Sequence, residues 1–197
     1  MECGRKASPQ FPTVERDAVS LPRQPKAVKL IMSFLYREEE ALTTVLTTVD
    51  GRYGPMDFLS EALSFDFTSY YEPEMGKNLK RRLASFRPLL SPEQLPGIKL
   101  WTNELEDRNR NEQQGRKVNI DPGYLAGAKL VLATGKDFSH RVYLRDGIYA
   151  DLTLIFQKGS FLVLPWTFPD YASPPLLDLL SRLRKRYLWQ TKNEGAE

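Results

Sequence analysis

The pattern of apolar and polar positions predicts both strands and helices in the first third of the chain. The run AVKLIMSFLY, residues 27–36, is nearly all apolar and predicts a buried strand. Residues 37–54 then repeat apolar side chains at helical spacing, and we expect Gly51 to end that helix. Residues 56–76 alternate loosely, which indicates an extended piece followed by an irregular loop.

Helices are predicted through the middle of the chain. The basic stretch NLKRRLASF, residues 78–86, is interpreted as a short helix, and residues 98–110 as a strand that turns helical. A longer, buried helix is expected after Asp121, because Asp at the cap followed by Pro122 at the first position is a typical helix start. Gly135 would end it.

The last third of the chain predicts hairpins and a final helix. Two alternating runs flank Asp146 and Gly147, the strongest short-range hairpin signal, and a turn at Gly159 gives a third strand and a β-meander. Ser173 and the proline after it then begin an amphipathic helix, whose apolar face holds Leu176, Leu180, Leu183 and Tyr187. This order of elements predicts the α+β class, with a mixed or largely antiparallel sheet and helices packed on it.

One domain is expected over residues 27–189, since 197 residues suit one large domain with tails. Residues 1–26 contain repeated prolines and no apolar period, so we expect a mobile N-terminal arm. We expect the C-terminal tail, residues 190–197, to fray.

Composition excludes several classes of site. The 28 basic and 25 acidic residues give a net charge of only +3, so whole-chain charge does not indicate a nucleic-acid partner. Cys3 is the only cysteine, which excludes an internal disulfide and a cysteine-based zinc site. His140 is the only histidine, which excludes any site with two histidines. The P-loop, the dinucleotide-binding glycine motif and the nucleophile elbow are missing. No run approaches the ~20 apolar residues of a membrane span, and the first residues lack the apolar core of a secretion signal. We therefore expect a cytoplasmic protein without a membrane partner.

The predicted helix start at Asp121 is the first candidate site. We favour a capping role for Asp121, yet helix amino-termini also attract anions, and Arg116 and Asn119 just upstream would strengthen that field. Lys129 is interpreted as an edge lysine that reaches water, and the alternative is a lysine that faces a cleft.

The predicted hairpin supplies a second candidate. With a two-residue turn at Asp146 and Gly147, His140 and Asp151 lie diagonally on one face, roughly 7–8 Å apart at the backbone. Such a pair acts as an acid or base near neutral pH. The equal alternative is a surface pair that contributes little.

The segment around Glu72 and Glu74 is the third candidate. These carboxylates, with neighbouring tyrosines, would line a polar pocket or hold Mg²⁺ through oxygen ligands. The alternative, which we favour slightly, is an interaction loop packed by its own aromatic side chains. The segment LPWTFPDY, residues 164–171, is expected to cover the sheet, with Asp170 as a turn former or a site residue.

The motifs FDFTSYYEPEMG, KLWTNELE, RKVNIDPGYL, LATGKDFSHRVYL, GIYADLTL and LPWTFPDY, in this order, resemble a prokaryotic family of unknown function, domain of unknown function 4416. The resemblance covers Val28 to Tyr187 and implies a single-domain cytoplasmic protein whose polar motif residues converge. Asp151 stands where we expect glutamate to be common in the family. The matching residues are Tyr71, Glu72, Glu74, Lys99, Asn103, Glu106, Arg116, Asn119, Asp121, Tyr124, Lys136, His140, Arg141, Asp151 and Asp170.

Our leading hypothesis is an enzyme or small-ligand binder with one polar cleft. Its acid–base or Mg²⁺-binding residues would be Glu72, Glu74, His140 and Asp151. An anionic ligand, phosphate- or nucleotide-like, would be bound by Arg116, Asn119, Tyr124, Lys136 and Arg141. The alternative is a non-catalytic module that binds protein or RNA through the basic, aromatic segments 78–86 and 181–189.

Overall fold

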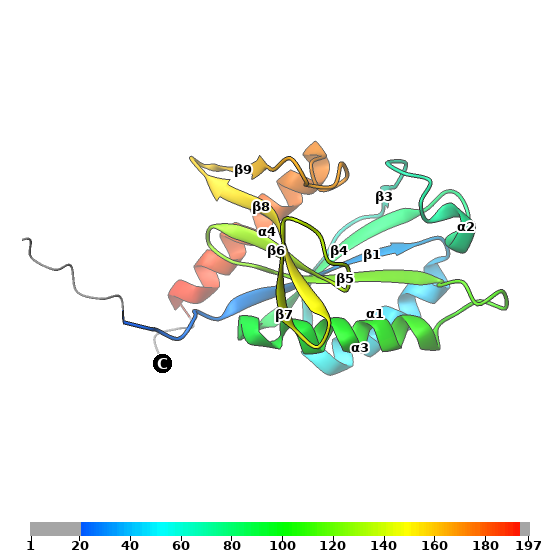
Figure 1. Ribbon diagram of the computed structural model, residues 1–197, viewed down its shortest axis with the longest axis horizontal. Helices are drawn as coiled ribbons and strands as arrows, with labels where there is room; N and C mark the ends of the chain where they lie inside the picture. Colours follow the sequence, from blue (N-terminus) through cyan, green and yellow to red (C-terminus); the bar gives the residue numbers. More distant parts are fainter. Residues whose placement is uncertain (1–20, 194–197) are drawn as a thin grey trace, which may run out of the picture.

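The computed structural model describes residues 21–193, and their strands form one nine-stranded sheet (Figure 1). The strand order is β2-β4-β1-β5-β6-β8-β7, with β3 beside β4 and β9 beside β8, and every pairing is antiparallel. The strands are β1 (Val28–Tyr36), β2 (Met56–Leu59), β3 (Leu63–Ser64), β4 (Lys80–Leu90), β5 (Val118–Leu125), β6 (Lys129–Thr134), β7 (Arg141–Arg145), β8 (Ile148–Gln157) and β9 (Ser160–Val163). The helices are α1 (Glu39–Tyr53), α2 (Glu72–Met75), α3 (Leu95–Arg108) and α4 (Pro174–Asn193), with a short 3₁₀ turn, η1 (Pro92–Gln94). The predicted α+β class is confirmed.

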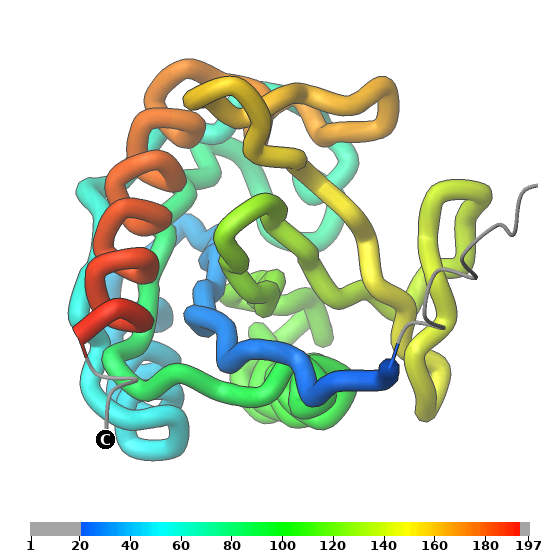
Figure 2. The backbone as a smooth tube through the Cα atoms, turned by 90° about the vertical axis from the view of Figure 1, so that its left-hand side faces the viewer, coloured from blue at the N-terminus to red at the C-terminus, as the bar shows by residue number. Residues whose placement is uncertain are grey.

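Strand β1 lies inside the sheet between β4 and β5, and all nine of its residues are buried. Its side chains alternate between two cores, as strand geometry requires. Met32 and Phe34 belong to the core formed with α1 and α3, which lie below the sheet in Figure 1. Ile31 belongs to the core beneath α4 on the other face. Figure 2 shows α4 (red) and the β7 hairpin (yellow-green) on opposite sides of the molecule.

The helix predicted over residues 78–86 is wrong, because residues 80–86 lie in β4. Strand β4 pairs with β1 on one side and with β2 and β3 on the other. Because successive side chains of a strand point to opposite faces of the sheet, Lys80 and Arg82 lie near Glu39 of α1 and Arg81 lies on the other face. The expected strand at the start of residues 98–110 is also wrong, since α3 already begins at Leu95 after the η1 turn.

The helix predicted after Asp121 is wrong as well, because Asp121 and Pro122 lie in β5. Strand β5 pairs with β6 only from Gly123 onward. Pro122 thus has one strand neighbour, the edge-like position that tolerates proline. A Cβ atom on Gly123 would lie 2.5 Å from the carbonyl oxygen of Val131, so the close approach of β6 requires glycine here.

The predicted hairpin and final helix are confirmed. Asp146 and Gly147 both have positive φ, and Arg145 faces Ile148 across a two-residue turn. A bulge between Tyr143 and Arg145 then shifts the register by one residue from the expected one. The predicted apolar face of α4 is buried, and the helix includes Gln190.

Two expected segments reach beyond the described residues. Residues 1–20 of the predicted arm and residues 194–197 of the predicted tail lie outside the described residues. Within residues 21–193, no helix has both the length and the apolar character that a membrane span requires.

Candidate functional site

Side chains from α3 replace a strand along the first half of β5, which has no β6 neighbour before Gly123. The backbone N–H of Ile120 donates to Oε1 of Glu106 at 2.6 Å. Its carbonyl accepts from Nζ of Lys99 at 2.9 Å, and that ammonium lies 4.0 Å from Asp121. Burial raises the pKa of Glu106, although nearby Lys99 opposes this shift. At the interruption of the sheet, β5 thus lies beside buried charged side chains of α3 instead of another strand.

Arg116 joins three separate elements at this edge. Its Nε and Nη2 donate to the two carboxylate oxygens of Glu74 on α2, each at 2.7 Å. Its Nη1 donates to Glu106 at 3.1 Å and to Asn119 at 2.6 Å. The amide of Asn119 in turn donates to Asp121 at 2.9 Å. The bidentate contact lowers the pKa of Glu74 and raises that of Arg116.

Lys136, in the loop between β6 and β7, connects this edge to a second group of side chains. Its ammonium donates to the hydroxyl of Tyr70 at 3.0 Å and lies 4.8 Å from the centre of that ring. The ammonium also lowers the pKa of the Tyr70 phenol. The carbonyl of Lys136 accepts from Arg141 at 3.0 Å. Within residues 21–193, Lys136 has no carboxylate in ion-pair contact, unlike Lys99, Arg116 and Arg141.

His140 lies at the second interruption of the sheet, where β7 ends and β9 begins along β8. Its Nε2 lies 3.2 Å from Oδ2 of Asp151, which also accepts from Nε of Arg141 at 3.0 Å. The indole of Trp166 stacks on the imidazole at 5.1 Å between ring centres, and its Nε1 donates to the carbonyl of Leu152. The expected approach of His140 to Asp151 is therefore observed, with Arg141 directly opposite Asp151 because of the β7 bulge.

The model of the family described as Domain of unknown function (DUF4416) matches residues 26–187, which include all nine strands. The chain belongs to this family. The family resemblance expected from the motifs is thereby confirmed. No curated protein matches the chain, and no solved structure does.

A buried ion pair in this DUF4416 chain was missed by the sequence reasoning. Nη1 of Arg81 lies 2.8 Å from Asp170 and donates to Ser33 at 2.9 Å. Burial raises the pKa of Asp170, although Arg81 opposes this shift. A strand interpretation of residues 78–86 would have separated Arg81 from its basic neighbours and indicated that it faces the core.

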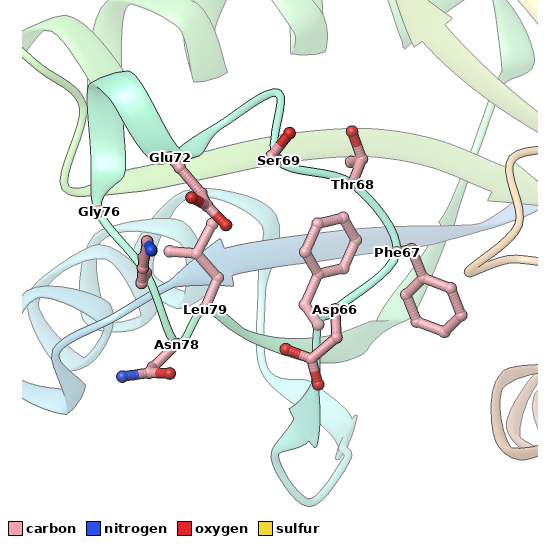
Figure 3. Close-up of a pocket in the computed structure, with 10 residues that line it drawn as sticks. Asp66, Phe67, Thr68, Ser69, Glu72, Gly76, Asn78 and Leu79 are labelled. Atoms are coloured by element: carbon pink, nitrogen blue, oxygen red, sulfur yellow. The ribbon is translucent and has the colours of Figure 1, made fainter.

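Two of the expected site residues lie elsewhere. Glu72 lines a cavity of about 300 Å³ beside α2, which Asp66 also lines (Figure 3). Glu72 and Glu74 lie two positions apart on α2, about 200° around a helix, so Glu74 faces Arg116 instead. Tyr124 packs with Leu95 on the sheet face that α3 covers.

The arrangement does not favour the expected Mg²⁺ site. Because Glu72 and Glu74 face opposite sides of α2, they do not present two carboxylates to one ion. In the described part of the chain, no three His, Cys, Asp or Glu side chains gather as metal ligands. The polar side chains gather in two groups, Glu74 with Arg116 and Asn119, and Asp151 with His140 and Arg141. Lys136 contacts Arg141 of the second group through its backbone carbonyl, and its ammonium contacts Tyr70, which precedes α2.

Proposed function

We propose that the chain binds a small anionic ligand, phosphate- or nucleotide-like, at the Lys136 site, which we define as Tyr70, Lys136, Phe138, His140 and Trp166. The observation that supports this proposal most is the Lys136 ammonium without a carboxylate partner in residues 21–193. A cation in this state attracts an anion more strongly than one already in an ion pair. The exposed ring of Tyr70 contacts this ammonium, and the exposed rings of Phe138 and Trp166 contact His140. Such rings offer flat surfaces to an attached base or other ring.

A proton-transfer role for His140 is the catalytic part of the proposal. Imidazole changes its protonation near neutral pH, and Asp151 holds this one through Nε2. Arg141 contacts the same carboxylate oxygen, and Trp166 stacks on the ring, so the imidazole is held on two sides. Asp151 and Arg141 would position His140, and the other ring nitrogen would act on the ligand.

The alternative, a protein- or RNA-binding module, has less support. Within residues 78–86, Lys80 and Arg82 lie near Glu39 and Arg81 is buried, so this segment offers no continuous exposed basic face. On α4, Arg182 and Arg186 also have carboxylate partners, Asp178 and Asp57. We also propose a cytoplasmic location and a prokaryotic origin. The cytoplasmic location fits the single cysteine among 197 residues.

A thermal-shift panel of nucleotides, sugar phosphates and inorganic pyrophosphate, with and without Mg²⁺, tests the proposal. A ligand at 100 times its dissociation constant stabilises the folded chain by about 2.7 kcal/mol. We expect at least one anion to raise the melting temperature of the wild type and of Lys185→Ala, which removes a lysine from α4. Lys136→Ala should lose the shift. An equal shift in both variants, or no shift across the panel together with retention of RNA, would refute the proposal.

A further inference from the structure

A second cavity lies between β3 and the start of α4, away from Lys136. Its volume is about 210 Å³, below the 300–1,000 Å³ typical of sites for drug-sized ligands, so it suits a single ring with one substituent. Its walls are mainly apolar and include Leu63, Phe65, Phe67 and Leu176. The charged pair Arg81 and Asp170 also lines it.

This charged pair has hydrogen-bonding capacity that the described residues do not use. The contact of 2.8 Å between Arg81 and Oδ2 of Asp170 is an ion pair without hydrogen-bond alignment, so that oxygen accepts no bond. Nε of Arg81 is also buried and donates to no partner in residues 21–193. Native interiors leave few buried polar atoms without a hydrogen bond, and a bound water or ligand commonly supplies the missing hydrogen bonds.

The local charges indicate what kind of polar group would fit. The carboxylates of Asp170 and Asp121 both act electrostatically on the single guanidinium of Arg81. Asp121 also lies 4.0 Å from Lys99, so Arg81 and Asp170 form a balanced pair, to which a ligand carboxylate or ammonium would add an unbalanced charge. A neutral group that both accepts and donates satisfies Arg81 and Asp170 without adding charge.

The rings around Arg81 define the shape of the occupant. The guanidinium carbon lies 5.0 Å from the ring centre of Phe65 and 5.1 Å from that of Tyr171. Phe67 is 45% exposed and lines the same cavity, so it offers a ring surface that remains accessible from solvent. Aromatic walls of this kind favour a planar apolar ligand over a flexible polar one.

We propose that this cavity binds a small, neutral, planar molecule that carries an amide or lactam group. The amide oxygen accepts from Arg81, the amide N–H donates to Asp170, and the ring packs against Phe65, Phe67 and Leu63. The proposal does not depend on the function of the Lys136 site.

Three probes of one size and different charge test the ligand class: benzamide, benzoate and benzylamine. Each is titrated into the full wild-type chain, and binding is followed by ligand-observed NMR. We expect benzamide to bind about tenfold more tightly than either charged probe, because only benzamide supplies both an acceptor and a donor without charge. Tighter binding of benzoate or benzylamine, or equal binding of all three, would overturn the proposal without any variant.

Two matched variants then locate the binding. Ser64 is exposed and lines the cavity, whereas Ala62 is exposed and does not line it. Ser64→Trp should weaken benzamide binding about tenfold or more, and Ala62→Trp should leave it unchanged. Lys136→Ala should also bind benzamide as the wild type does, which separates this test from that of the anion site. Unchanged binding by Ser64→Trp, with circular dichroism showing a native fold, would contradict the assignment.

Discussion

Replacement of Arg116 by alanine tests whether the charged edge of β5 depends on this single guanidinium. The variant removes the bidentate contact with Glu74 and the contacts with Glu106 and Asn119. Helices α2 and α3 and strand β5 would then lose the cation that they share. We therefore expect a lower free energy of unfolding and weaker anchoring of α2.

The two carboxylates that lose Arg116 contribute unequally to the loss. The Glu74 side chain is 31% exposed, so water replaces much of its lost contact. The Glu106 side chain is 6% exposed and keeps the Ile120 N–H and nearby Lys99 as partners. Breaking a fully buried ion pair costs about 3–5 kcal/mol. Because one carboxylate regains water and the other keeps partners, we expect about 2–3 kcal/mol for Arg116→Ala.

Equilibrium unfolding in urea measures this loss, and Arg108→Ala is the matched control. Arg108 forms an exposed pair with Glu104 on α3, and such a pair is worth about 0.3–0.5 kcal/mol. A loss below about 1 kcal/mol for Arg116→Ala, or a loss equal to that of Arg108→Ala, would show that the Arg116 contacts do not organise this edge.

Three further predictions concern stability. Burial raises the pKa of Glu106 above its ordinary 4.5, so its stabilising contribution is present below pH 4.5 and is lost as the pH rises through the folded-state pKa. In urea unfolding at several pH values, Glu106→Gln should lack this pH-dependent loss of stability. Lys29 is fully buried and ion-paired, so Lys29→Met should lower the free energy of unfolding by about 3 kcal/mol in the same assay, and a smaller loss than that of Arg108→Ala would contradict it. Gly123→Ala should disrupt the β5–β6 pairing and lower the melting temperature, whereas Gly135→Ala, with nothing within 4 Å of the added carbon, should melt as the wild type does.

The elements that the sequence predicted correctly have local causes. The apolar run of β1, the helical spacing of α1 and the turn residues Asp146 and Gly147 each define their element without distant partners. The expected end of α1 at Gly51 is wrong, because the helix continues to Tyr53 and Gly54 follows it. The contact of His140 with Asp151 was predictable for the same reason, because one short hairpin brings the two together. The bulge near Leu144 was not, since no turn residue specifies it.

The elements that were misread depend on distant partners. Most of the basic stretch that was interpreted as a short helix lies in β4, and Glu39 and Asp170 contact its basic side chains from other elements. The Asp121–Pro122 pair is a helix start by local rules, yet β1 lies beside it and holds it in a strand. Arg116 and Glu74 were both named from the sequence. Their direct contact spans 42 positions, and no local pattern specifies such a contact.

The most direct test of the proposed function follows the only histidine in the chain. In a protein made without a histidine tag, the ring signals of His140 are unambiguous in NMR. We predict that titration with inorganic pyrophosphate and with ATP moves these signals in the wild type. In Lys136→Ala the same movement should require about tenfold more ligand. Signals of His140 that stay in place with both anions, or that move equally in wild type and Lys136→Ala, would contradict an anion site at Lys136.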